Sequence, residues 1–228
     1  MELSVIIPVY NEKETIGESI GRVRKAEPGD KEIIVIDDGS SDGTRDILKG
    51  IKEDGTRVIF HEENVGKGGA VRTGLAQAKG DIVIIQDADL EYDPQEISQL
   101  IKPIRDGVAD AVYGTRLTGG RPQRVHMFWH KVANTIITLV ANILYNSTLT
   151  DVMTCYKAFS KDCIKDIKIK SNGFSVEPEL TAKILKKNAR LYEIPISYYG
   201  RSYKEGKKIR FYHGFGALWA LLKFRFID

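Results

Sequence analysis

The chain has 228 residues, of which 42% are hydrophobic and 29% charged, and its formal net charge is +3. These values describe an ordinary soluble protein that can bury a full core, in one domain or in one domain with an appendage. No apolar run reaches the roughly 18 to 20 residues of a membrane-spanning helix, so we expect no spanning segment in this sequence. Cys155 and Cys163 match no metal-ligand spacing and follow no secretory signal, so we expect a reduced, cytoplasmic protein.

Short apolar runs alternate with helix-favouring segments in the first half of the chain. Residues 14–26 and 68–79 favour helices, and Asn11 with Glu14 is typical of an N-cap and its capping-box partner. The alternation predicts βαβ units, and therefore an α/β fold whose mostly parallel sheet has helices on both faces. Strands are expected at residues 3–9, 32–38, 57–62, 81–89 and 110–116.

The second half begins with a Gly/Pro/basic loop after Arg116. The apolar positions of residues 132–145 then recur at helical spacing. Two interpretations of this helix stay open: it packs on the core, or it docks on a membrane. The remaining expected elements are a helix at 177–188, a strand within 190–199, a polar loop to Arg210 and a terminal amphipathic helix at 215–226.

Carboxylates follow the apolar run at residues 82–85, which is typical of a strand buried on both faces. Asp87, Asp89 and Glu91 occupy every second position after it. Crowded acidic side chains raise each other's pKa unless a cation or a donor-rich ligand neutralises them. The spacing therefore predicts a divalent metal site at the end of this strand.

Two other strands also end in polar clusters, "PVYNE" at residues 8–12 and "DDGSSDGT" at residues 37–44. Because the carboxyl ends of parallel strands lie along one edge, the clusters are expected in one cleft. "NVGKGGAVRTG", residues 64–74, opens a helix with glycines and supplies Lys67, which suits a loop near phosphate. Taken singly, residues 37–44 are equally explained as a turn and helix cap, and residues 64–74 lack Walker spacing.

In this order and spacing, "IIPVYNE", "VIDDGSSDGT", "NVGKGGAVRTG" and "QDADLEYDP" resemble the GT-A nucleotide-sugar domain of family 2 glycosyltransferases. "TDVMTCYKAF", "GFSVEPELTAKIL" and "EIPISYYGRSYKEGKKI" are similar to the branch that loads sugars onto polyprenyl phosphates, such as dolichol-phosphate mannose and glucose synthases. The resemblance covers residues 3–210. It implies a Rossmann-like, three-layer GT-A catalytic domain at residues 1–210, followed by a C-terminal amphipathic helix at residues 211–228.

The resemblance also implies a donor site. Asp37 would accept a hydrogen bond from the base, and Lys67 would lie near the base or the diphosphate. Asp89 would bind Mn2+ or Mg2+ directly, and Asp87 and Glu91 would complete or orient the ligand set, with Asp87 also near the nucleotide. Many relatives have Gln at the position of Glu91. The nucleoside pocket would be lined by Pro8, Tyr10 and Glu12.

An acceptor site is implied as well. Arg116, Arg201 and Lys204 would bind the phosphate groups, together with Lys131, which stands where relatives often carry Arg. Asp151 lies where inverting relatives place a base-like carboxylate, so it would orient the acceptor or take a proton. The alternative to a role at the acceptor is a structural one, in which the Asp151 carboxylate caps a turn.

We therefore expect an inverting, metal-dependent hexosyltransferase that acts on a polyprenyl or dolichyl phosphate. The expected donor is GDP-mannose, ahead of UDP-glucose. Two alternatives remain: transfer to a saccharide or protein hydroxyl, and a noncatalytic nucleotide-sugar-binding subunit. A polyprenyl tail cannot leave the bilayer cheaply, so the chain is expected peripherally on the cytoplasmic face of an anionic membrane, with or without a membrane-anchoring partner protein.

Basic residues crowd the last quarter of the chain, which indicates an anionic partner, although a solvated helix face explains such a run equally well. We expect no nucleic acid as the partner. The residues are Lys183, Lys186, Lys187, Arg190, Arg201, Lys204, Lys207, Lys208 and Arg210.

Overall fold

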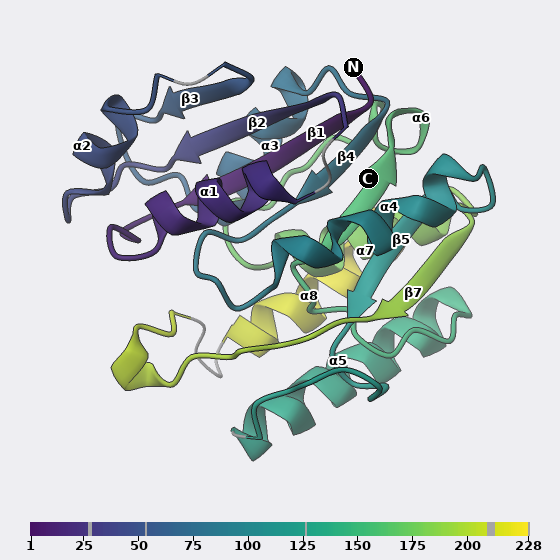
Figure 1. Ribbon diagram of the computed structural model, residues 1–228. Helices are drawn as coiled ribbons and strands as arrows, with labels where there is room; N and C mark the ends of the chain where they lie inside the picture. The colour runs from purple at the N-terminus through teal and green to yellow at the C-terminus, as the bar shows by residue number, and fades with distance from the viewer. Residues whose placement is uncertain (27–28, 53, 126, 209–212, 228) are drawn as a thin grey trace.

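The strands form one seven-stranded sheet in the order β3-β2-β1-β4-β6-β5-β7 (Figure 1). The computed structural model describes residues 1–26, 29–52, 54–125, 127–208 and 213–227. Only β6 runs against its neighbours β4 and β5, so the predicted α/β fold with a mostly parallel sheet is confirmed. The strands are β1 Leu3–Val9, β2 Lys31–Asp37, β3 Thr56–Phe60, β4 Ile82–Ile85, β5 Ala111–Thr115, β6 Lys157–Ser160 and β7 Leu191–Pro195.

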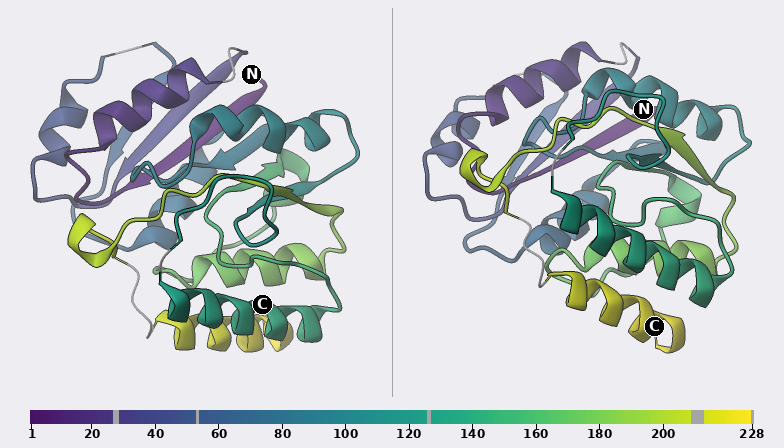
Figure 2. Two further views of the ribbon diagram at one scale, coloured as in Figure 1. Left: turned by 60° about the horizontal axis from the view of Figure 1, so that its bottom comes forward. Right: turned by 90° about the horizontal axis from the view of Figure 1, so that it is seen from below.

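Helices cover both faces of the sheet (Figures 1 and 2). One apolar layer joins the inner sides of α1 and α4 to β1, β2 and β5, and a second joins α3, α5, α7 and α8 to the opposite face. The helices are α1 Ile16–Lys25, α2 Thr44–Lys49, α3 Lys67–Gln77, α4 Ile97–Arg105, α5 Phe128–Tyr145, α6 Lys161–Ile164, α7 Val176–Lys186 and α8 His213–Phe226, with short 3-10 turns at η1 Pro94–Glu96 and η2 Tyr203–Glu205.

The expected start of the first helix was wrong. Thr15, not Asn11, is the N-cap of α1, and Asn11 has a left-handed backbone with φ +50. Its side-chain Oδ1 instead accepts a hydrogen bond from the Ser41 N–H at 2.8 Å. Asn11 therefore ties together the loops that follow β1 and β2, which lie on the edge of the sheet that carries the polar clusters.

The terminal helix α8 packs on the molecule along one side. Ala217, Ala220, Leu221 and Phe224 are buried against α5 and α7, and the Tyr145 hydroxyl donates to the Leu221 carbonyl at 2.7 Å. Figure 2 shows α5 and α8 side by side at the bottom of the molecule. The expected domain boundary at 210/211 and Arg210 itself lie outside the described residues.

Candidate active site

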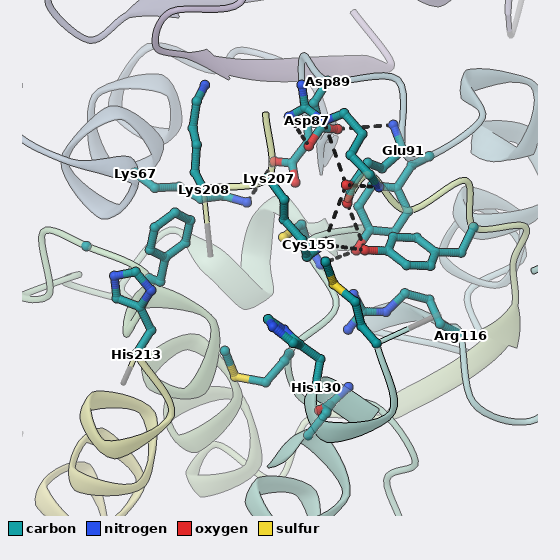
Figure 3. A pocket seen from close by; sticks show the side chains of 18 of the residues that line it. Lys67, Asp87, Asp89, Glu91, Arg116, His130, Cys155, Lys207, Lys208 and His213 are labelled. Carbon is teal, nitrogen blue, oxygen red and sulfur yellow. Dashed lines mark hydrogen bonds and ion pairs between the residues drawn. The ribbon is translucent and has the colours of Figure 1, made fainter. Parts of the chain in front are cut away.

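A cavity of ≈ 1200 Å³ opens at the carboxyl ends of β1, β4 and β5. It gathers most of the residues expected from the sequence: Pro8, Tyr10, Glu12, Lys67, Asp87, Asp89, Glu91, Arg116, Lys131 and Arg201. Three expected residues, Asp37, Asp151 and Lys204, do not contribute to its described lining. The polar clusters of separate strand ends therefore meet in one cleft (Figure 3).

Lys67 and Asp87 form an ion pair at the back of the cavity. Lys67 is the first residue of α3, and its Nζ lies 2.7 Å from Asp87 Oδ1, just beyond β4. Burial raises the pKa of Asp87, but Lys67, Cys155 and Arg116 together outweigh burial, so the pKa lies below its ordinary value. Asp87 is therefore held as a carboxylate.

Asp89 lies among negative charges that are only partly balanced. Burial, together with the negative charges of Asp87 and Glu91, raises the pKa of Asp89 to about 7. Arg201 Nη2 lies 3.1 Å from Asp89 Oδ2 and works in the opposite direction. The Asp89 carboxylate can thus gain from further positive charge.

Glu91 is already well supplied with donors. Its Oε1 accepts from the Arg201 N–H at 2.6 Å, and its Oε2 accepts from the Tyr198 hydroxyl at 2.8 Å. Lys207 Nζ adds a longer contact at 3.5 Å. Glu91 therefore binds three residues of the segment after β7 and holds this segment against the cavity.

Arg201 also pairs with Glu12, which follows β1. Its Nη1 and Nη2 each lie 2.9 Å from one oxygen of Glu12, and Lys208 Nζ lies 2.6 Å from Glu12 Oε1. Burial raises the pKa of Glu12, but Arg201 and Lys208 together bring it below its ordinary value. The cations of residues 201–208 thus meet the carboxylates of the strand ends.

Arg116, just after β5, forms a bidentate ion pair with Asp151. Its Nε and Nη2 contact the two carboxylate oxygens at 2.6 and 2.7 Å. Asn134 Nδ2 donates to the same carboxylate at 2.8 Å, and Asp151 is 0% exposed. Burial raises the pKa of Asp151, but Arg116 and Asn134 together outweigh burial, so the pKa lies below its ordinary value. This geometry lets Asp151 orient Arg116, which faces the cavity.

Of the other expected residues, Lys131 lines the cavity, whereas Asp37 and Lys204 lie outside its described lining. Asp37 ends β2, where Oδ2 accepts from Arg45 Nε at 2.8 Å, while its buried Oδ1 has no hydrogen-bond partner among the described residues. Lys131 lines the cavity from the first turns of α5 and is exposed. Lys204, in η2, is exposed to solvent.

A model of the family described as "Glycosyl transferase family 2" matches residues 4–168, more than half of the chain. The chain belongs to glycosyltransferase family 2. A solved structure of glucosyl-3-phosphoglycerate synthase from Mycobacterium tuberculosis, in complex with Mn2+, UDP and phosphoglyceric acid, has a TM-score of 0.75. It covers 100% of this chain and 79% of its own at 22% identity, and with the sheet topology it confirms the GT-A fold.

Curated relatives of this family 2 chain include three named enzymes, each 29% identical. Undecaprenyl-phosphate mannosyltransferase from Micrococcus luteus matches 91% of this chain and 87% of its own length. Dolichol-phosphate mannosyltransferase from Pyrococcus furiosus matches 91% of this chain, and glycosyltransferase AglJ from Haloferax volcanii matches 86%. The chain spans only 59% and 63% of these last two enzymes.

The oxygen ligands that this glycosyltransferase offers to a divalent metal are the carboxylates after β4. No group of three His, Cys, Asp or Glu side chains in the described ranges is arranged to hold a metal ion. Lys67 and Arg201 instead supply the positive charge beside Asp87 and Asp89. The chemistry nevertheless fits a hard cation, because Asp89 offers carboxylate oxygen in surroundings that already disfavour its negative charge.

Several lining residues were not expected from the sequence. Lys207 and Lys208 were noted only as part of a basic run, since the fold of a polar loop cannot be deduced from composition. Asn134 lies among the apolar positions of α5, and its side chain donates a hydrogen bond to Asp151. The lining also includes apolar side chains that no periodic pattern in the sequence indicated: Met127, Phe128, Trp129, Met153 and Phe174.

Proposed function

We propose that this glycosyltransferase transfers a hexose from a nucleotide sugar to a polyprenyl phosphate, with inversion at the sugar. Mannose from GDP-mannose is the preferred donor, and glucose from UDP-glucose is the second choice. Relatives named undecaprenyl-phosphate and dolichol-phosphate mannosyltransferase support the acceptor class. The complex of the synthase from M. tuberculosis with Mn2+ and UDP supports a nucleotide donor with a divalent metal.

One observation supports the lipid acceptor: the cavity is lined both by the carboxylates of the strand ends and by apolar side chains at the start of α5. It begins at Asp87 and Asp89 and continues past Arg116 to the first turns of α5 and α8, where Phe128 and Trp129 line it. Their side chains are also largely exposed outside, at 67% and 76%. A phosphate held near Arg116 would thus be joined to an apolar chain that leaves between these helices.

The donor would bind against the strand ends. Asp89 and Asp87 would hold Mn2+ or Mg2+, which when bound stabilises the negative charge that develops on the leaving diphosphate. Lys67 orients Asp87 through their 2.7 Å ion pair. The free Oδ1 of Asp37 is the acceptor proposed for a base N–H.

The acceptor phosphate would bind to the cations on the other side of the cleft. Arg116 offers a guanidinium fixed by Asp151, and Arg201, Lys131 and Lys204 are the further proposed contacts. A phosphate oxygen is already ionised near neutral pH, so attack on the sugar needs no strong base. The full engagement of Asp151 with Arg116 agrees with an orienting role.

An apolar outer face supports docking on a membrane. Trp219 and Phe215 of α8 are 66% and 70% exposed, beside Leu139 and Ile143 of α5 at 56% and 72%. Such a large exposed apolar patch marks an interaction site, and Trp suits the membrane interface. None of the helices in the described ranges has both the length and the apolarity to cross a membrane. We propose peripheral binding at the cytoplasmic face, directly or beside a membrane-anchoring partner.

A panel assay tests the proposed function. The purified chain is incubated with Mn2+, a short polyprenyl phosphate and each of several nucleotide sugars, and release of the nucleoside diphosphate is measured. The expected result is rapid release with GDP-mannose or UDP-glucose that depends on the acceptor. The matched control is the corresponding polyprenol, which lacks the phosphate and should not stimulate release. Equal stimulation by the polyprenol or by a free saccharide would overturn the proposal.

A further inference from the structure

Four charged side chains form a buried series behind the cavity. Lys157 Nζ lies 2.8 Å from Glu177 Oε2, Glu177 Oε1 lies 3.4 Å from Lys67 Nζ, and Lys67 Nζ lies 2.7 Å from Asp87 Oδ1. Their signs alternate along the series. Only Lys67 and Asp87 line the cavity, so Glu177 and Lys157 act on the site from behind.

Lys157 fixes the far end of the series. It lies in the middle of the sheet on β6 and is 0% exposed. Its ammonium donates to the carbonyls of Val152 and Thr154 as well as to Glu177. A buried ammonium is costly unless it is paired and fully hydrogen-bonded, so this lysine holds the Glu177 carboxylate in one position.

Glu177 has an oxygen left over. Oε2 accepts from Lys157, whereas the buried Oε1 accepts no hydrogen bond among the described residues. It faces Lys67 at 3.4 Å, which is an ionic contact. The contact therefore adds to the 2.7 Å pair with Asp87 and gives the Lys67 ammonium two carboxylates to lie between.

The backbone holds Lys67 in the same place. The N–H of Gly68, the next residue in α3, donates to the Asn172 carbonyl at 2.6 Å. A Cβ on Gly68 would lie 2.1 Å from the Ser171 carbonyl oxygen, so only glycine permits this approach. Glu179, two residues after Glu177 on α7, accepts hydrogen bonds from the N–H groups of Lys170 and Ser171 at 2.7 Å each. The start of α7 thus holds the start of α3 in two ways: through the backbone hydrogen bonds of residues 170–172 and through the ionic contact of Glu177 with Lys67.

We infer that Glu177 is a positioning residue of the donor site: held by Lys157, it sets the position of Lys67 and, through Lys67, the orientation of Asp87. The inference rests on the proposed function, because it assigns Lys67 and Asp87 to binding of the nucleotide diphosphate with its metal. Glu177 itself does not belong to the described lining of the cavity.

The test is the affinity of the full chain for GDP and for UDP with Mn2+, measured by calorimetry. Glu177→Gln keeps the shape of the side chain and removes its charge. It should lower the affinity for whichever of the two nucleotides binds more tightly by roughly 10- to 100-fold. The matched control is Glu32→Gln: Glu32 is also a buried carboxylate, 3% exposed and 2.9 Å from Arg57, but it lies outside the described lining of the cavity. It should lower stability without changing nucleotide affinity.

The Glu177→Gln protein can fail to fold because Lys157 loses its charged partner, so a double variant is needed as a second test. Lys157→Met with Glu177→Gln removes both charges and should show the same loss of affinity. In a Lys67→Met background, Glu177→Gln should change affinity by less than about two-fold, because the two residues act as one unit. Unchanged affinity in a folded Glu177 variant, or full additivity with Lys67→Met, would overturn the inference.

The calorimetric measurement needs no acceptor. An absence of transfer to polyprenyl phosphate would therefore count against the proposed function alone, while the loss or retention of nucleotide affinity in the Glu177 variants would still decide the positioning role.

Discussion

Arg201 Nη2 lies 3.1 Å from Asp89 Oδ2, so a side chain of the protein supplies positive charge at the carboxylate that we expect to bind a metal. The same guanidinium makes two 2.9 Å bonds to Glu12. A cation that binds Asp89 must share it with Arg201 or displace Arg201. Arg201 would then be free to meet the phosphate groups.

The first prediction concerns this competition. Arg201→Met removes the internal cation from Asp89 and should tighten Mn2+ binding roughly ten-fold in the absence of nucleotide, because the metal no longer competes with the guanidinium. Titration of free Mn2+ by electron paramagnetic resonance measures the change. Lys102→Met, which breaks an exposed 2.6 Å pair with Asp106, is the control. Weaker Mn2+ binding in the Arg201 variant would show that Arg201 supports the metal site.

The second prediction concerns Asp89 itself. Asp89→Ala should reduce turnover by a factor of roughly 10² to 10³ and remove the metal dependence of nucleotide binding, since a hard cation loses its proposed ligand. The fold should remain, because the Asp89 side chain is 18% exposed at a cleft and not part of the apolar core. Circular dichroism and thermal melting check the fold. Full activity of this variant, or of the wild type in excess EDTA, would contradict the metal site.

The third prediction concerns stability against pH at Asp151. The folded pKa of Asp151 lies below its unfolded value of 3.8, so the ionised carboxylate stabilises the fold above that value and the contribution is lost as pH falls through the folded pKa. Asp151→Asn should cost about 3 kcal/mol near neutral pH, because it leaves Arg116 without its charged partner. Urea unfolding near pH 7 and near pH 3 should show the wild-type advantage shrinking. A gap that is constant with pH would rule out this ion pair as its source.

The fourth prediction uses the same variant to separate the acceptor classes. If a phosphate attacks, Asp151→Asn should slow transfer without removing a limb of the pH–rate profile. A hydroxyl acceptor would need a general base, and the bell-shaped profile would then lose its acidic limb. Rates of both proteins across the pH range decide between these cases. A lost limb would favour a saccharide or protein hydroxyl.

The fifth prediction concerns the membrane. Trp219→Ser with Trp129→Ser should weaken binding to anionic liposomes roughly ten-fold or more, because both indoles are largely exposed, at 66% and 76%. Tyr192→Ser, at an exposed residue of β7, is the control and should have no effect. Lys207 and Lys208 face Glu91 and Glu12 in the cavity, so their replacement by Ser should matter less than that of exposed Lys204. Wild-type protein that stays in the supernatant at low salt would exclude direct docking.

The sequence predicted the sheet well because strand signals and cluster positions are local. Buried residues 82–85 and the carboxylates that follow them could be placed at the end of a strand without knowing their neighbours. Family resemblance then assigned Asp89 and Arg116 to one cleft, where both lie. The prediction that Asn11 is an N-cap was wrong because Asn is common both at helix N-caps and in loops. In the structure its side chain accepts a hydrogen bond from Ser41, in the loop after another strand, instead of capping α1.

Partners across long sequence separations could not be predicted. Arg201 and Glu12 are 189 positions apart, and nothing in either segment specifies the other. Asp151 was expected at the acceptor, and its burial against Arg116 depends on how β5 and α5 pack around it. The role inferred for Glu177, in helix α7, likewise depends on the buried Lys157 in strand β6.

The most direct test of the central claim is the mass of the lipid product. The chain is incubated with Mn2+, the preferred nucleotide sugar and a short polyprenyl phosphate, and the organic extract is analysed by mass spectrometry. The account predicts a new species equal to the acceptor plus one hexose residue, present with wild type and absent with Asp89→Ala. Hexose found only on a saccharide or protein added in competition, with the polyprenyl phosphate unchanged, would contradict it.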